Sequence, residues 1–291
     1  MSLITTFFFY LLLLVITLIP FKALYAFSDF MRFIMRNIVR YRVKVIRENI
    51  KRAFPEKSDQ EIKDIEKKAY KHLIDYIVEG VKAFTMSKKT IIKRHKLVNP
   101  ELIEPFFKQN KSIIAVTAHY NNWEWGSLSA SLQTDYKAIA FYKRLRNKYI
   151  DKALRKSRTR CGTTLSSIYE TTKTFEKNRN NPVIYLMAAD QSPSKKLLNK
   201  ALWINFLGIN TPFLQGPEKH ARINNYPVVY VDIEQTKRGY YELFLTILTD
   251  NPNSLKEGEL TKLYAQKLEQ NIINKPESWL WSHKRWKHVP L

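Results

Sequence analysis

The pattern of apolar and polar positions divides the chain into a helical first third and a remainder in which strands and helices alternate. Residues 112–117 form an almost wholly apolar, β-branched run that is too short for a helix, and this run predicts a buried parallel strand. Similar runs predict further strands at residues 137–142, 183–189, 226–233 and 241–248. We therefore expect an α/β fold with a mixed, mostly parallel sheet of about six strands, flanked by helices.

Helical spacing of apolar residues is clearest in the first third of the chain. Residues 27–47 are rich in arginine and predict an amphipathic helix, which lies either on anionic headgroups or on the protein core with a solvated basic face. Ser58-Asp59-Gln60-Glu61 has the pattern of a capping box. It predicts the start of a second helix that runs toward Val81.

The beginning of the chain predicts a membrane anchor. Residues 3–19 are apolar apart from four hydroxyl-bearing side chains and carry no charge, and Pro20 ends the run. We expect an N-terminal membrane helix, with a short span and a monotopic insertion both open. A cleaved signal peptide is the alternative. However, the basic residues follow the apolar run instead of preceding it, which favours a retained anchor with the body of the protein on the cytoplasmic side.

No repeat or low-complexity linker interrupts the rest of the chain. We therefore expect a membrane anchor at residues 1–21 and one domain at residues 22–291. Within that domain, residues 22–98 form a helical lead-in and residues 99–291 form the α/β core that carries the chemistry.

Charge and composition narrow the functional classes. The chain has 49 basic and 26 acidic residues and a net charge of +23, which predicts an anionic partner. Nucleic acid and an anionic membrane surface both fit this charge, and the apolar beginning of the chain favours the membrane surface and no nucleic acid. The single Cys161 and the absence of metal-ligand spacing argue against a disulfide framework and a metal site. Because no nucleotide-binding glycine motif and no G-x-S-x-G occur, the sequence gives no support to a nucleotide-binding protein or a serine hydrolase.

A histidine follows the first predicted strand at the edge where ligands bind in open α/β sheets. His119 lies just past this strand, and Glu124 lies five residues further on, beyond Asn121 and Asn122, which offer an asparagine as a helix N-cap. Imidazole titrates near neutral pH, and a carboxylate on its other nitrogen would fix its tautomer and stabilise the imidazolium. The pair predicts general-base catalysis on a hydroxyl. A histidine that only caps the strand end is the alternative.

Two other polar groups belong to the same region of the predicted sheet. Asp190 and Gln191 follow the strand at residues 183–189 and should reach the same edge as His119. Between residues 143 and 160, nine lysines and arginines accompany a single acidic residue. This segment predicts a basic helix that faces either a phosphate group or a membrane surface.

Three blocks of this sequence resemble the membrane glycerolipid and lipid A acyltransferases. His-Tyr-Asn-Asn-Trp-Glu at residues 119–124 is similar to their H-x4-[D/E] block, and to its lipid A version except for Asn121, where glycine is usual. Asp190-Gln191 and the tryptophan-rich segment 276–287 follow in the expected order. Together the three blocks extend over most of the chain.

The resemblance implies a membrane-bound O-acyltransferase of the inner membrane, with its catalytic domain facing the cytoplasm. His119 would deprotonate a hydroxyl of a phosphorylated glycolipid, a lipid A precursor, while Glu124 holds the imidazole. The hydroxyl would then attack the thioester of an acyl carrier protein or coenzyme A, which serves as co-substrate. No metal and no further cofactor would be required.

The resemblance also suggests which residues bind the substrates. Arg158 or Arg160 would hold the phosphate of the acceptor, and Asp190 would organise the acceptor site together with Gln191 and Asn122. The apolar segment 202–213 would be an irregular wall against an acyl chain or a bilayer, or buried core. Segment 276–287 predicts either an interfacial anchor or a packed terminal cap.

Two alternatives remain open at this point. The first is an acyltransferase that acts on another lipid, such as a lysophospholipid or an amino-acid lipid. The second is a basic membrane-surface or nucleic-acid-binding protein without enzymatic activity, which the net charge alone would support.

Overall fold

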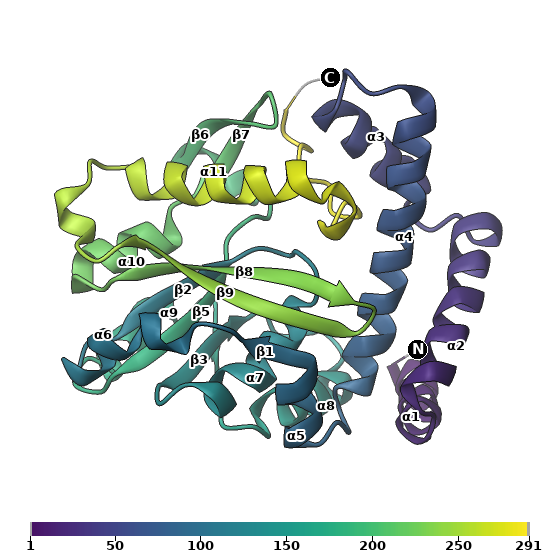
Figure 1. Ribbon diagram of the computed structural model, residues 1–291, viewed down its shortest axis with the longest axis horizontal. Coiled ribbons are helices and arrows are strands. Elements are labelled where there is room, and N and C mark those ends of the chain that lie inside the picture. Colours follow the sequence, from purple (N-terminus) through teal and green to yellow (C-terminus); the bar gives the residue numbers. More distant parts are fainter. Residues whose placement is uncertain (1, 290–291) are drawn as a thin grey trace.

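The structure, a computed structural model, describes residues 2–289 and contains one large sheet with helices on both faces (Figure 1). Seven strands form this sheet in the order β1-β9-β8-β2-β5-β3-β4. They are β1 (His95–Leu97), β2 (Ile113–Thr117), β3 (Lys137–Tyr142), β4 (Thr164–Ser167), β5 (Val183–Ala188), β8 (Val228–Lys237) and β9 (Tyr240–Thr249). All neighbouring strands are parallel except β8 and β9, which form an antiparallel hairpin. The predicted α/β fold is confirmed.

The helices surround the sheet on three sides (Figure 1). Helix α11 covers one face, α5, α7 and α8 lie on the other face, and α4 crosses one end of the sheet. Helices α1 and α2 lie on the outer side of α4. The α-helices among the described residues are α1 (Ser2–Leu18), α2 (Phe21–Phe33), α3 (Val43–Ala53), α4 (Asp59–Lys82), α5 (Lys88–Arg94), α6 (Glu104–Lys108), α7 (Gly126–Gln133), α8 (Lys148–Thr159), α9 (Thr171–Lys177), α10 (Gly216–Asn224) and α11 (Glu259–Asn274).

Burial on both faces explains the uninterrupted apolar sequence of β2. Ile114 and Val116 belong to the core that includes residues of α11, whereas Ile113 and Ala115 belong to the core on the opposite face. All four side chains are at most 2% exposed. A strand covered on both faces has no solvent-facing position, so its sequence does not alternate. The chain leaves β2 at its carboxyl end and reaches His119 two residues later.

The structure contains strands that the apolar pattern did not predict. Strands β1 and β4 are short edge strands of three and four residues. The segment predicted to be irregular forms an antiparallel hairpin of β6 (Ala201–Phe206) and β7 (Ile209–Leu214). Leu207 and Gly208 make its turn with φ values of 52° and 73°. Two positive φ values are typical of a type I′ hairpin turn. Leu207 is an unusual residue for that position, so this turn could not be predicted from its residues.

The helical first third is more broken than its periodicity predicted. Helix α2 ends at Phe33, a π-helical turn covers Ile34–Ile38, and α3 begins only at Val43. Arg40 and Arg42 lie between them with φ values of 54° and 53°, so no single amphipathic helix extends over residues 27–47. The predicted capping box is present: the Ser58 side chain accepts from the backbone N–H of Glu61, and the Glu61 carboxylate accepts from the backbone N–H of Ser58.

The apolar beginning of the chain forms helix α1, which has 17 residues. At about 1.5 Å per residue this helix is shorter than the ~30 Å hydrocarbon core of a bilayer. Over residues 2–289, no helix combines the length and the apolar character needed to cross a membrane, so the predicted spanning helix is not supported. The C-terminal end of α1 is held on the protein by the Lys82 ammonium, which donates to the carbonyls of Ile16, Thr17 and Ile19 at 2.8–3.1 Å.

The tryptophan-rich segment near the end of the chain is buried. Trp279, Trp281 and Trp286 are 5%, 2% and 3% exposed and belong to the largest core cluster. Trp279 forms an antiparallel bridge with Tyr120, next to His119. This segment is a packed terminal cap, and its interpretation as an interfacial anchor was wrong because its indole rings fill the core beside the histidine loop.

Candidate active site

The loop after β2 brings His119 into contact with a carboxylate. Strands β2 and β5 are parallel neighbours with Thr117 opposite Ala188, so the residues two positions further along each strand meet. His119 Nδ1 lies 2.6 Å from Asp190 Oδ1. The His119 side chain is 19% exposed and the Asp190 side chain 3% exposed. The predicted convergence of these two residues at one sheet edge is confirmed.

Asp190 is held in its ionised form by its neighbours. Its second oxygen, Oδ2, accepts from the indole N–H of Trp279 at 2.9 Å. Burial alone would raise the pKa of Asp190, but the charge and hydrogen bonds of His119, with the Trp279 hydrogen bond, lower that pKa to about 2. A buried carboxylate with a fixed orientation can hold the imidazole in the tautomer that has its proton on Nδ1.

The imidazole therefore has a different partner from the one predicted. Glu124 binds Arg158 through two hydrogen bonds, from Nε to Oε1 at 2.5 Å and from Nη2 to Oε2 at 2.7 Å. The backbone explains the change. Asn121 has a φ of 49° and residues Trp123–Trp125 form a 3₁₀ turn, so the chain turns toward α8 before it reaches Glu124. The prediction that Glu124 holds the His119 ring was wrong, and Asp190 occupies that place.

His119, Glu124, Arg158 and Gln191 line the same cavity, which has a volume of about 590 Å³. The cavity extends along the sheet face that α7 and α8 cover, and most of its deeper lining is apolar. Its apolar lining includes Ala115, Ile184, Leu186, Val231, Leu243 and Leu245 from the sheet, Ala130 from α7 and Leu154 from α8. Leu145 and Ile168 also line it and are each 44% exposed, so the cavity reaches the surface beside them. This cavity combines a few charged side chains with a largely apolar lining.

Three predicted binding residues do not line this cavity: Asp190, which binds His119 instead, Arg160 and Asn122. The side chain of Arg160 donates from Nη2 to the backbone carbonyl of Ala83 at 2.6 Å. Asn122 is fully buried, and its Oδ1 accepts from the backbone N–H of Trp125. Asn122 is thus the N-cap that the sequence predicted.

The structure adds residues to the site that sequence reasoning missed. The Trp123 ring lies edge-on to the His119 ring with 4.9 Å between centroids, and it stacks on Tyr76 of α4 at 4.0 Å. Trp279 and Glu79 also support the histidine loop. The tryptophan-rich segment was one signal for Trp279, whereas nothing in the periodicity of α4 separated Tyr76 and Glu79 from ordinary core positions.

Comparison with known proteins agrees with this arrangement. A family model described as bacterial lipid A biosynthesis acyltransferase matches residues 1–288. The chain belongs to this family. No curated protein matches the sequence at the level required for a relative. Membership supports an acyltransferase, and therefore an enzyme, with a lipid acceptor and an acyl donor.

The described residues 2–289 contain no group of three or more histidine, cysteine, aspartate or glutamate side chains that could hold a metal ion. The absence of a cofactor stays a prediction.

Proposed function

We propose that this protein is a membrane-bound O-acyltransferase that moves a fatty acyl chain from a thioester donor to a hydroxyl of a phosphorylated glycolipid, a lipid A precursor. The observation that supports this most is that His119, paired with Asp190, lines a largely apolar cavity of about 590 Å³ together with Glu124 and Arg158. The polar side chains suit polar reactants, and the apolar lining suits a hydrocarbon chain.

In the proposed reaction, His119 is the general base. Its Nδ1–H donates a hydrogen bond to Asp190 and keeps its proton, so Nε2 is free to accept the proton of the acceptor hydroxyl. The oxygen attacks the thioester carbonyl, and the C–S bond breaks when the tetrahedral intermediate collapses. The imidazolium returns its proton to the leaving thiolate, so the products are an ester and a free thiol. Asp190 stabilises the imidazolium between these two proton transfers.

Arg158 is the best placed residue to hold a phosphate of the acceptor. Its guanidinium faces the cavity in which His119 lies, and guanidinium groups bind phosphate in fixed, often bidentate geometry. Burial lowers the pKa of Arg158, but its hydrogen bonds and ion pair with Glu124 raise that pKa above the usual value, so the side chain stays charged. Arg160 is engaged with Ala83 and is the weaker candidate.

The same proposal places the protein at the cytoplasmic face of the inner membrane. Helix α1 exposes a continuous apolar surface, on which Leu3, Phe7 and Leu18 are 70%, 64% and 75% exposed. The net charge of +23 favours an anionic lipid surface. A helix of this kind can insert into one leaflet without crossing the bilayer.

The direct test is an assay of the purified protein in detergent, with acyl chains on acyl carrier protein or on coenzyme A and with phosphorylated and dephosphorylated glycolipid acceptors. We expect an ester product by mass spectrometry, and a lower KM for the phosphorylated acceptor. Transfer to lysophospholipid or amino-acid lipid alone would replace the proposed acceptor. No transfer from either thioester would contradict the proposed reaction.

Variants of Arg158 test the phosphate site, with variants of two exposed lysines of α8 as controls. Arg158→Ala should raise the acceptor KM in detergent, where bilayer charge is absent, and Arg158→Lys should restore it only in part. Lys148→Ala and Lys152→Ala on the exposed side of α8 should leave that KM unchanged. Equal effects at all three positions would mean that α8 acts only through its bulk charge.

A further inference from the structure

Helix α4 reaches the histidine loop with two side chains that lie one turn apart. Tyr76 stacks on Trp123, and Glu79 lies behind the loop with no exposed surface. The reaction proposed above does not use Glu79. A fully buried carboxylate is costly unless its oxygens are paired, so its partners indicate why it is there.

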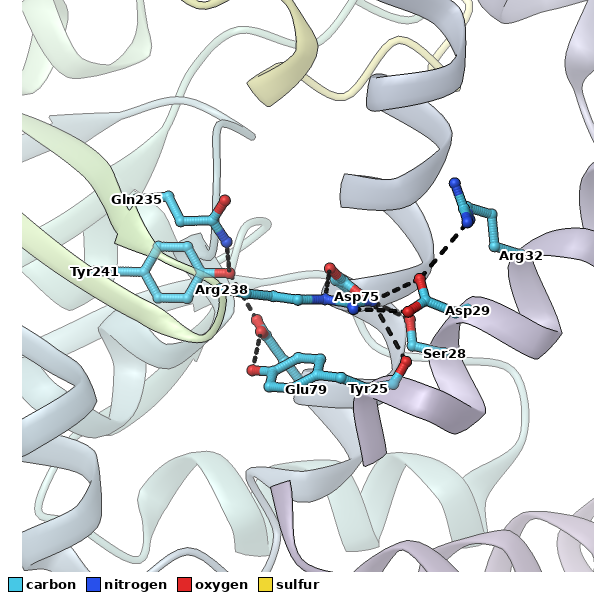
Figure 2. Close-up of polar contacts among 9 residues, drawn as sticks. All are labelled: Tyr25, Ser28, Asp29, Arg32, Asp75, Glu79, Gln235, Arg238 and Tyr241. Atoms are coloured by element: carbon cyan, nitrogen blue, oxygen red, sulfur yellow. Dashed lines mark hydrogen bonds and ion pairs between the residues drawn. The ribbon is translucent and has the colours of Figure 1, made fainter. Parts of the chain in front are cut away.

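Three uncharged groups donate hydrogen bonds to Glu79, each from a different element. Tyr25 Oη of α2 donates to Oε1 at 2.7 Å and Tyr241 Oη of β9 donates to Oε2 at 2.8 Å; Figure 2 shows Glu79 between these two rings. Asn122 Nδ2 donates to Oε2 at 2.6 Å. The backbone carbonyl of Glu79 also accepts from the indole N–H of Trp125 at 3.1 Å. Glu79 therefore joins α2, the hairpin and the histidine loop.

Three polar atoms of Asn122 form hydrogen bonds: Nδ2 and Oδ1 of the side chain and the backbone carbonyl oxygen. Its Nδ2 donates to Glu79 and its Oδ1 accepts from Trp125 N–H. Its backbone carbonyl accepts from His95 Nε2 at 3.1 Å, while His95 Nδ1 lies 2.7 Å from Ser129 Oγ. Burial lowers the pKa of His95 to about 3, so the ring is neutral and its single N–H is available for the Asn122 carbonyl. Asn122 lies between His119 and Glu124 in the chain, so its hydrogen bonds restrain the loop that carries both side chains.

We propose that Glu79 is a positioning residue for acyl transfer, which holds Asn122 and thereby fixes the loop that carries His119 and Glu124. The same contacts make α2 part of the support of the active site, because Tyr25 is one of the donors to Glu79. This inference rests on the proposed function only where acyl transfer is the readout.

The structure offers a matched control one turn away on α4. Arg238 binds Asp75 of α4 and Asp29 of α2 with hydrogen bonds of 2.7–3.0 Å, and Figure 2 shows this cluster beside Glu79. The cluster also joins α2 to α4 and the hairpin. Arg238 binds Tyr25, Asp29 and Asp75, and within residues 2–289 none of these hydrogen bonds reaches the histidine loop. Asp29 is 41% exposed, and Asp29→Asn removes one charge of this cluster while the hydrogen bonds of Tyr25 to Glu79 and of Asn122 to Glu79 stay in place.

The test exchanges the donor and the acceptor in the hydrogen bond between Asn122 and Glu79. Burial raises the pKa of Glu79 to about 7, so the test is made above that pH. There Asn122→Asp places two carboxylates together and should lower kcat per folded molecule by about 10²-fold, because a misplacement of about 1 Å at a reacting group costs that much. Adding Glu79→Gln restores an amide facing a carboxylate, and Tyr241 can then accept where it formerly donated. We expect the double variant to recover most of the lost kcat, with the KM values of both substrates near wild type in all cases. Asp29→Asn should keep wild-type kcat.

A second readout does not depend on the proposed function. The rate at which diethyl pyrocarbonate modifies His119, followed by peptide mass spectrometry, should rise in Asn122→Asp, return toward wild type in the double variant and stay unchanged in Asp29→Asn. If Asn122→Asp does not fold, a folded double variant with wild-type modification rate supports the contact equally. A double variant no better than Asn122→Asp in both readouts would overturn the proposal. Wild-type protein without acyl transfer would instead contradict the proposed function, and the modification rates would still decide the role of Glu79.

Discussion

Two acid–base pairs contribute side chains to the lining of the cavity, and they differ in what they can do. In the first, His119 and Asp190 share a hydrogen bond of 2.6 Å, and Asp190 is almost completely buried. In the second, Glu124 accepts two hydrogen bonds from Arg158, and both side chains are partly exposed at 12% and 22%. Imidazole can take up and release a proton near neutral pH, whereas a guanidinium cannot release one. The first pair is suited to proton transfer, and the second to holding α8, the loop and an anion in place.

The largest effect should come from removing the base of the first pair. His119→Ala should lower acyl transfer by about 10²–10⁴-fold, the usual contribution of a general base, while the protein stays folded. Steady-state kinetics and thermal unfolding of the purified variant measure the two quantities. Wild-type turnover by the folded variant would remove His119 from the reaction.

The two pairs should behave as separate units in double-mutant cycles. Glu124→Gln and Arg158→Lys disturb one shared bidentate contact, so the double variant should lose no more activity than the worse single variant. Asp190→Asn combined with Glu124→Gln should instead give losses that multiply. The kcat/KM values of these variants distinguish the cases. Multiplicative losses within the Glu124–Arg158 pair would show that its members act independently.

Stability as a function of pH should reveal the pairing of Asp190 with His119. The pKa of Asp190 is lowered to about 2 in the folded protein, below its usual 3.8, so its ionised form contributes stability that is present above about pH 4. That contribution is lost as the pH falls through about 2. The difference in unfolding free energy between wild type and Asp190→Asn should therefore shrink by about 2 kcal/mol between pH 5 and pH 2. Urea unfolding at several pH values measures it, and a constant difference would contradict the pairing.

The second hydrogen bond to Asp190 can be removed while the carboxylate stays in place. Trp279→Phe keeps the aromatic ring but removes the indole N–H that donates to Oδ2. A hydrogen bond to a buried charge contributes about 1.5–3 kcal/mol, so the variant should be less stable by about that amount. We expect slower transfer as well, because Asp190 gains freedom to turn. Thermal unfolding and kinetics check both, with Trp286→Phe as the control, since Trp286 donates to Thr211 instead.

The strands β2, β3 and β5 around His119 could be predicted because their apolar patterns have a simple cause. Strand β2 is covered on both faces, and the predicted strand at residues 137–142 has the observed bounds of β3. The parallel neighbours β2 and β5 then placed His119 and Asp190 at one edge. Strands β1 and β4 escaped prediction because edge strands of three or four residues carry too few positions for a pattern.

The partners within the site could not be predicted from spacing in the sequence. Glu124 is five residues from His119, but the positive φ of Asn121 and the following 3₁₀ turn direct its side chain toward Arg158. Glu79 lies 43 residues from Asn122, and only the crossing of α4 over the loop brings them together. Contacts of this kind depend on tertiary packing, which leaves no local signal in the sequence.

In the proposed reaction Asp190, and not Glu124, holds the His119 imidazole. The proton on His119 Nδ1, hydrogen-bonded to a buried carboxylate, should give a strongly downfield ¹H NMR signal in protein labelled with ¹⁵N at histidine. We predict that this signal persists in Glu124→Gln and disappears in both Asp190→Asn and His119→Ala. A signal that survives in Asp190→Asn but is lost in Glu124→Gln would contradict the claim and return the imidazole to Glu124.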